Sequence, residues 1–208
     1  VDEEDTSPLN SNQEDELIAK FKELIGTKID AIIIEDYNKG LLTPRVINEV
    51  ISLAKANNII VAVDPKKENF FEYKNVTLFK PNLKELKEGL NLEFDINKNN
   101  GEFETAIDNL EEILTNEISF VTLSSYGVFV KHGSDKNFIP AHVRNISDVS
   151  GAGDTVISVA TLCLTAGLSA KEMAEIANLS GGLVCEMSGV VPIDKELLMI
   201  ELRKIVLA

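Results

Sequence analysis

The stretch AIIIEDYNKGLLTPRVINEVISLAKANNIIVAV, residues 31–63, indicates the architecture of the chain. It opens and closes with continuous apolar runs, 31–34 and 59–63, which are typical of strands buried on both faces. Between them, Thr43-Pro44 marks the start of a helix, and its apolar positions recur with helical spacing up to Asn57. Strand, helix and strand in this order predict two parallel strands joined by a crossover helix.

The rest of the chain continues this alternation. A capping box of Ser11 and Glu14 predicts a helix that ends at Gly26. Strands are predicted at 76–79 and 118–123, antiparallel additions at 127–131 and 137–141, and helices from 82 and at 103–114, 153–166, 170–187 and 194–206. The fold class is therefore α/β, a mostly parallel sheet with helices on both faces. Without repeats or a low-complexity linker, one domain spanning 1–208 is expected.

The composition of the chain limits which binding partners and which cellular compartment can be expected. With 20 Lys and Arg against 34 Asp and Glu, the net charge of −14 argues against nucleic acid and against an anionic membrane. Cys163 and Cys185 fall in apolar helical patterns, which predicts buried free thiols in a reducing compartment. His132 and His142 lack partners at metal-ligand spacing. The chain has no apolar stretch of 18 residues, so a cytoplasmic location is expected.

The segment Asp148-Val149-Ser150-Gly151-Ala152-Gly153-Asp154-Thr155 opens a predicted helix and resembles a cradle for an anion. Its small residues let backbone N–H groups approach a ligand, and the amides of a first helical turn lack intrahelical partners. Asp154 lies beside the same docked group, in a place suited to accept a proton during phosphoryl transfer. The alternative is a tight turn with Asp154 as a capping residue.

Polar residues also follow the predicted strands, where parallel sheets bind ligands. Asp36 and Lys39 follow the first predicted strand, where Lys39 could meet an anionic group of a substrate, and Lys66 follows the second strand. For Asp36 and Lys39, the alternative is a solvated loop with a charge pair. Asn82 and Glu85 follow the third predicted strand. They could form a capping box, bind hydrated Mg²⁺, or do both. The turn 122–127 suits nucleotide phosphates, although a plain hairpin connection explains it equally well.

In this order, the motifs resemble those of the ribokinase-like carbohydrate kinases, the PfkB family. Asp148–Asp154 is similar to the family's Asp-Thr-x-Gly-Ala-Gly-Asp motif, Asn82–Glu85 to its Asn-x-x-Glu element, and 122–127 to its nucleotide loop. The resemblance implies a ribokinase-like fold of which the chain covers the C-terminal two-thirds. The N-terminal strands, the β lid and the Gly-Gly sugar motif have no counterpart.

Further residues resemble the branch that phosphorylates D-glycero-D-manno-heptose 7-phosphate at the anomeric hydroxyl, giving the 1,7-bisphosphate for lipopolysaccharide precursors. They are 36–40, 64–66, Ser124, the Val156-Ile157 pair and Val159. The alternatives are a kinase of this fold for another sugar or a nucleoside, and a non-catalytic nucleotide-binding fragment that lacks the lid. A nucleotidyltransferase domain follows in some relatives, but its His-x-Gly-His motif is absent from this sequence.

The resemblance also implies roles for the matched residues. Asp154 would be the catalytic base, and the amides of Gly151, Ala152 and Gly153 the anion hole. ATP and Mg²⁺ would be the cofactors, with the nucleotide bound by Thr122, Ser124, Gly127, Asn178 and Asn82 and Mg²⁺ bound through water by Asn82 and Glu85. The sugar phosphate would be bound by Asp36, Lys39 and Lys66. A monovalent cation such as K⁺ would bind at Asp148 and Ser150. The partners would be ATP and a sugar phosphate, with a homodimer in the full-length protein.

Overall fold

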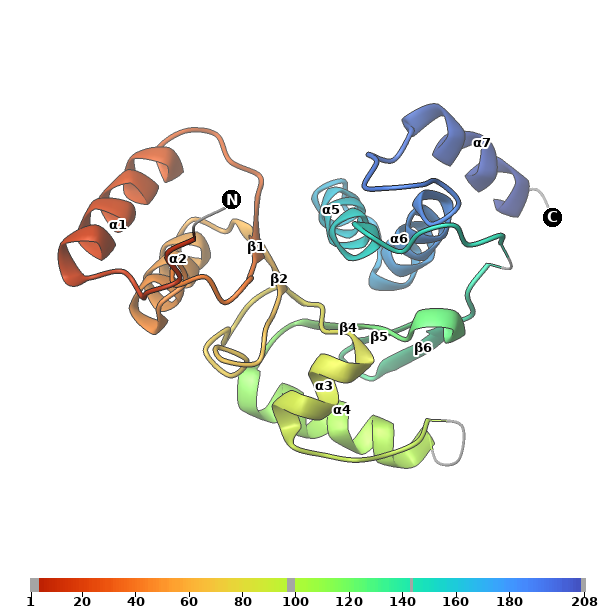
Figure 1. Ribbon diagram of the computed structural model, residues 1–208, viewed down its shortest axis with the longest axis horizontal. Coiled ribbons are helices and arrows are strands. Elements are labelled where there is room, and N and C mark those ends of the chain that lie inside the picture. Colours follow the sequence, from red (N-terminus) through yellow and green to blue (C-terminus); the bar gives the residue numbers. More distant parts are fainter. Residues whose placement is uncertain (1–3, 97–99, 143, 207–208) are drawn as a thin grey trace. The chain divides into compact units, whose positions relative to one another are not determined.

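The computed structural model describes residues 4–96, 100–142 and 144–206 (Figure 1). The chain divides into two compact units, Val1–Ser119 and Phe120–Ala208, called here unit 1 and unit 2. Its elements are α1 (Ser11–Ile25), β1 (Ala31–Glu35), α2 (Pro44–Ala56), β2 (Ile60–Asp64), β3 (Leu78–Phe79), α3 (Leu83–Leu90), α4 (Asn100–Leu114), β4 (Ile118–Thr122), a 3₁₀ turn (Ser124–Tyr126), β5 (Val128–His132), β6 (Asp135–Ile139), α5 (Ala152–Thr165), α6 (Ala170–Val184) and α7 (Lys195–Val206). The assignment of one domain stays a prediction.

The sheet has the strand order β1-β2-β3-β4-β5-β6 in the described residues. Strands β1 to β4 pair in parallel, and β5 pairs with β6 antiparallel. The predicted α/β class and the antiparallel additions are therefore confirmed. In unit 1, Glu35 at the end of β1 pairs with Asp64 at the end of β2. The loops after these strands thus leave the same edge of the sheet, which is where ligands bind in such folds.

The prediction that β1 is buried on both faces is wrong. Within the described sheet β1 is an edge strand, and Ile33 is 39% exposed whereas its neighbour Ile34 is 6% exposed. Successive side chains point to opposite faces of a strand, and only the face that carries Ile34 is covered. The second apolar run behaves as predicted, because Val61 and Val63 in β2 are both buried.

Helix α1 begins with a different cap from the predicted one. Asn10, not Ser11, is the N-cap, and its side-chain oxygen accepts hydrogen bonds of 3.1 Å from the amides of Asn12 and Gln13. Gln13 completes the capping box through the amide of Asn10. Glu14 instead binds Thr43, the N-cap of α2, so the carboxylate joins two helices that lie side by side in Figure 1. Local spacing could not show this contact between helices.

Unit 2 is organised around the packing of α5 against α6. A methyl group on Gly181 of α6 would lie only 2.6 Å from Cγ2 of Val156 in α5, so the absence of a side chain at Gly181 allows close approach. Helix α6 also contacts the β5–β6 hairpin. This packing holds the first turn of α5, which carries the Gly-rich segment, on a rigid helix pair.

The two cysteines are free thiols, as predicted, but the predicted burial is confirmed for Cys163 and wrong for Cys185. Cys163 is buried and Cys185 is partly exposed, and burial raises the pKa of both thiols. Among the described residues, the helices are too short or too polar to span a bilayer.

Candidate active site

Helix α5 begins within the Gly-rich segment, as the sequence predicted, and its role as an anion cradle stays a prediction. Gly151 is the N-cap, with φ +76° and ψ 0°, a left-handed conformation that glycine adopts without strain. The caps of α1, α2, α3 and α6 are side chains of Asn10, Thr43, Asn82 and Ser169, whereas no side chain in the described residues caps α5. The amides of Gly153 and Asp154 therefore remain available to an anion, whereas the amide of Ala152 donates to the carbonyl oxygen of Val149 over 3.3 Å. Asp154 lies in this turn and is exposed.

Asp148 organises the loop that leads into this turn. Its carboxylate accepts hydrogen bonds from the amide of Ser150, at 2.9 Å, and from the amide of Gly189, at 3.1 Å. The backbone and side-chain hydrogen bonds with Ser150, followed by the one from Gly189, lower the pKa of Asp148. Both carboxylate oxygens thus already bind amides, which orders the loop. A monovalent cation at Asp148 and Ser150 stays a prediction.

The turn after β4 has a structural reason for its glycine. Ser124 opens the 3₁₀ turn with φ +56°, and Gly127 closes it with φ +94°. The amide of Leu123 donates to the carbonyl of Gly127 over 2.8 Å, so the turn reverses the chain tightly. A methyl group on Gly127 would lie 2.1 Å from the carbonyl oxygen of Ile139. Close backbone approach therefore requires glycine here, and nucleotide binding by Thr122, Ser124 and Gly127 stays a prediction.

Asn178 links α6 to the segment that follows β6. Its side-chain amide donates to the carbonyl oxygen of Pro140 over 2.9 Å. This bond fixes the orientation of the side chain. The predicted contact of Asn178 with adenine is not tested by this geometry.

Asp36, predicted to contact the sugar phosphate, is 3% exposed at the end of β1. It accepts hydrogen bonds from the Tyr73 hydroxyl at 2.7 Å, the Asn38 amide at 2.8 Å and the Asn69 side chain at 3.2 Å. Burial and the hydrogen bond to Asp36 raise the pKa of Tyr73 far above its usual value, so its hydroxyl keeps the proton that it donates. Asp36 therefore orders the loop after β1 as the centre of a buried polar network.

The substitution Tyr73→Phe should lower the free energy of unfolding by about 1–3 kcal/mol, because it removes a donor from a buried carboxylate. Urea unfolding monitored by circular dichroism measures this loss. Tyr37→Phe is the matched control, since Tyr37 is 57% exposed and its hydroxyl donates to Glu35 over 3.3 Å. Equal effects of the two substitutions would contradict a structural role for the bond between Tyr73 and Asp36.

Lys39 pairs with a residue outside this network. Its ammonium forms an exposed ion pair of 2.7 Å with Glu4. It also lines a cavity of about 410 Å³ together with residues of the N-terminal segment, Asp5, Ser7, Pro8, Leu9, Asn10 and Gln13, and with Leu41. Sugar-phosphate binding by Lys39 stays a prediction.

Charged side chains meet where β2 and β3 end. Lys80, 2% exposed, pairs with Asp64 over 2.8 Å. Lys66 donates to Glu85 and lies 3.8 Å from the other oxygen of Asp64. Burial acts to lower the pKa of Lys66, but its hydrogen bond to Glu85 and the charges of Asp64, Glu85 and Asp36 raise it overall. Lys66 therefore carries its positive charge among three carboxylates.

The predicted capping box of α3 is present. Asn82 accepts from the amide of Glu85 and Glu85 accepts from the amide of Asn82, each over 2.8 Å. The two candidate magnesium ligands thus meet each other, and Glu85 also meets Lys66. The sequence analysis did not select Asp64 or Lys80 as site residues, although both directly end or follow predicted strands. Their position after parallel strands was the signal that could have found them.

The described residues contain no group of three or more His, Cys, Asp or Glu side chains that could hold a metal ion. A resident metal cage is therefore not present in this part of the chain. Magnesium commonly keeps several waters and is bound by one or two carboxylates and by substrate phosphates. Glu85 and Asn82 fit that mode, because they offer oxygens next to the strand ends without enclosing an ion.

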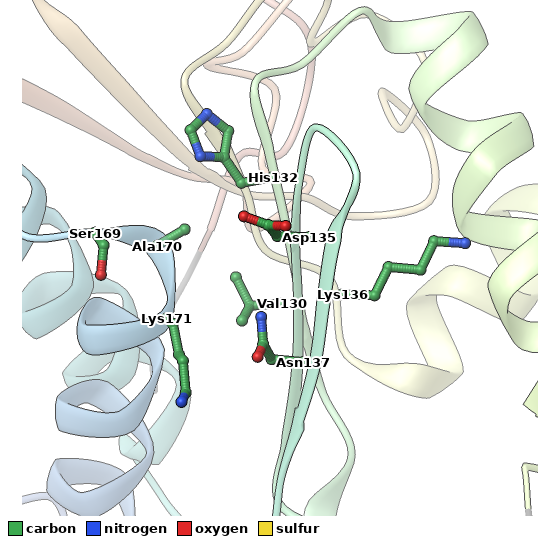
Figure 2. Close-up of a pocket in the computed structure, with 8 residues that line it drawn as sticks. All are labelled: Val130, His132, Asp135, Lys136, Asn137, Ser169, Ala170 and Lys171. Carbon is green, nitrogen blue, oxygen red and sulfur yellow. The ribbon is translucent and has the colours of Figure 1, made fainter.

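Figure 2 shows a cavity of about 320 Å³ within unit 2, between the β5–β6 hairpin and the first turn of α6. It is lined by Val130, His132, Asp135, Lys136, Asn137, Ser169, Ala170 and Lys171. None of the predicted site residues is in this lining. The predicted site residues of unit 1 lie after its strand ends, and those of unit 2 lie at the start of α5, at and after the end of β4, and in α6.

Comparisons with known proteins agree with these features. The family described as "pfkB family carbohydrate kinase" matches residues 5–196. The "Bifunctional protein HldE" of Campylobacter jejuni subsp. doylei is 40% identical over 194 residues, which is 93% of this chain and 41% of that protein. HldE of Helicobacter pylori is 35% identical over 91% of this chain and 40% of its own length. The chain thus spans about two fifths of these curated relatives.

Solved structures have the same fold. Phosphofructokinase-2 from Escherichia coli in complex with potassium superposes with a TM-score of 0.83 at 20% identity, over 96% of this chain and 64% of that one. Arabidopsis thaliana ribokinase, complexed with ribose and ATP, gives a TM-score of 0.73 at 14% identity, over 95% of this chain and 60% of that one. The predicted ribokinase-like fold is confirmed.

Proposed function

Because the chain belongs to the pfkB family of carbohydrate kinases, we propose that it supplies the phosphoryl-transfer machinery of an ATP-dependent sugar kinase. The observation that carries this proposal is the start of α5, where a glycine cap leaves amides available and Asp154 stands exposed in the same turn. Phosphoryl transfer depends mainly on positioning and on stabilisation of developing negative charge. The N-terminus of α5 offers both in one turn.

In the proposed reaction, the carboxylate of Asp154 accepts the proton of the sugar hydroxyl as its oxygen attacks the γ-phosphorus of ATP. The bond between that phosphorus and the bridging oxygen breaks, and ADP leaves. The amides of Gly151, Ala152 and Gly153 stabilise the negative charge that develops on the phosphoryl oxygens.

The nucleotide and its metal are assigned to the remaining motifs. We assign the phosphate and ribose side to Thr122, Ser124 and Gly127 and the adenine to Asn178, with Asn82 near the phosphates. Asn82 and Glu85 would hold hydrated Mg²⁺. When bound, Mg²⁺ neutralises part of the charge of the phosphates.

For the substrate, we propose D-glycero-D-manno-heptose 7-phosphate, phosphorylated at the anomeric hydroxyl. The heptose-kinase pattern of residues 36–40, 64–66 and 156–159 supports this choice, as does the similarity to HldE over nine tenths of the chain. Lys39 and Lys66 are the candidate cations for the sugar phosphate, and Asp36 holds the loop that carries Lys39. A monovalent cation at Asp148 and Ser150 is supported by the potassium complex of a protein with this fold. A homodimer of the full-length protein remains part of the proposal.

The test is an ADP-release assay across heptose 7-phosphate, fructose 6-phosphate, ribose and adenosine, in a form of the protein that contains these residues. We expect turnover with the heptose phosphate to exceed the others by at least about tenfold in kcat/KM, equivalent to about 1.4 kcal/mol of transition-state binding. Phosphorus NMR of the product should show a new anomeric phosphate.

Preferred turnover of ribose or adenosine would contradict the proposed substrate but would still support the assignment as a kinase. Binding of nucleotide, measured by calorimetry, without turnover of any sugar would instead favour a non-catalytic nucleotide-binding module.

A further inference from the structure

The contacts of Lys66 suggest more than a static ion pair. Its ammonium donates to one oxygen of Glu85, while the second oxygen of Glu85 accepts from the amide of Asn82. Every oxygen of the proposed metal carboxylate is therefore already bound within the chain. A hydrated cation at Glu85 competes most directly with the positive charge of Lys66, whose side chain is also more mobile than the backbone amide because it is 35% exposed.

A second partner for Lys66 is already in place. Asp64 is nine-tenths buried, and its Oδ2 atom pairs with Lys80 over 2.8 Å. Its Oδ1 atom is buried and has no hydrogen-bond partner in the described residues. This oxygen lies 3.8 Å from Nζ of Lys66, about 1 Å beyond a charge-assisted hydrogen bond. A buried oxygen without a donor is unfavourable, so it favours any rearrangement that brings one.

We propose that Lys66 is a movable counter-ion that occupies Glu85 in the unliganded chain and shifts to Oδ1 of Asp64 when a hydrated divalent cation binds at Glu85. This inference rests on the proposed function, since it takes Glu85 as the carboxylate that receives the metal. The exchange keeps both charges compensated: the cation neutralises Glu85, and Lys66 completes the hydrogen bonding of Asp64. Lys66 is thus a positioning residue that competes with the metal.

Mn²⁺ is a suitable probe, because the signal of the free ion in electron paramagnetic resonance measures binding without turnover. It is titrated with and without a non-hydrolysable ATP analogue. Lys66→Met should tighten Mn²⁺ binding by about three- to fivefold, since it removes a partly exposed competing charge. Lys66→Arg keeps the charge and should give no tightening. Lys84→Met is the matched control, because Lys84 lies one residue before Glu85, is 82% exposed and pairs with Glu88.

Direct evidence comes from a crystal structure with Mn²⁺ located by its anomalous signal. We expect Nζ of Lys66 within hydrogen-bond distance of Oδ1 of Asp64. Lys66 still on Glu85 with Mn²⁺ bound would overturn the inference, as would equal Mn²⁺ affinities of Lys66→Met and Lys84→Met.

Glu85→Gln separates failure of this inference from failure of the metal assignment. Glutamine keeps the capping box, so the helix should still form. Loss of Mn²⁺ binding in Glu85→Gln, together with unchanged binding in Lys66→Met, would overturn the inference alone. Unchanged Mn²⁺ binding in Glu85→Gln would overturn both the inference and the proposed metal role of Glu85.

Discussion

The substitution Asp154→Asn should reduce kcat of the sugar kinase by on the order of 10² to 10⁴. Asparagine has nearly the shape of aspartate but cannot take the proton of the attacking hydroxyl. The amides of the same turn belong to the backbone, so nucleotide binding should persist. ADP release measures kcat, and calorimetry measures the affinity for ATP, in a form of the protein that turns over a sugar.

Asp135→Asn is the control for this experiment. Asp135 is an exposed aspartate of unit 2 at the start of β6, and it belongs to none of the proposed site motifs. We expect its turnover to equal that of the unmodified protein. Wild-type turnover in Asp154→Asn would exclude Asp154 as the base and leave the anion cradle without its proposed chemistry.

The second large effect concerns folding. Gly127→Ala should lower the free energy of unfolding by about 3–5 kcal/mol, from backbone strain and overpacking together. The strain arises at φ +94°, and the added methyl group would lie 2.1 Å from the carbonyl oxygen of Ile139 and 2.5 Å from the amide nitrogen of Ala141. Both contacts are with backbone, which cannot move aside as a side chain can. Urea unfolding measures the loss.

Gly133→Ala is the control that separates the cost of backbone strain from the cost of the steric clash. Gly133 also has a positive φ, +58°, but no atom lies within 4 Å of an added methyl group. Its loss should be about 1 kcal/mol, the usual cost of a left-handed alanine. Equal losses at the two positions would show that the close approach of the chain after β6 does not constrain Gly127.

Patterns of a few neighbouring residues predicted much of the fold. A continuous apolar run located β2, Thr43-Pro44 located the start of α2, and the Asn82–Glu85 spacing predicted the capping box of α3. These features depend on spacings of two to four residues, so the sequence displays them directly.

Contacts between distant residues were not predictable in this way. In the sequence, Asp36 looked like a loop residue. Its buried hydrogen bonds could not be predicted, because two of its donors, Asn69 and Tyr73, lie 33 and 37 positions further along the chain. The apolar run of β1 indicated burial on both faces, but exposure also depends on which strands flank it. Lys66 could be placed near anions but not on Glu85, since that bond depends on how the ends of β2 and α3 meet.

The ion pair between Asp64 and Lys80 limits how this protein can change over time. Lys80 is 2% exposed, so replacing Asp64 alone would leave an uncompensated charge in the interior. Such a lone buried charge typically costs about 3–5 kcal/mol, much of the stability of an ordinary domain. Replacement of Asp64 while Lys80 is kept is therefore strongly disfavoured. We expect Asp64 and Lys80 to covary among related proteins. An engineered variant that replaces one of them should replace the other at the same time.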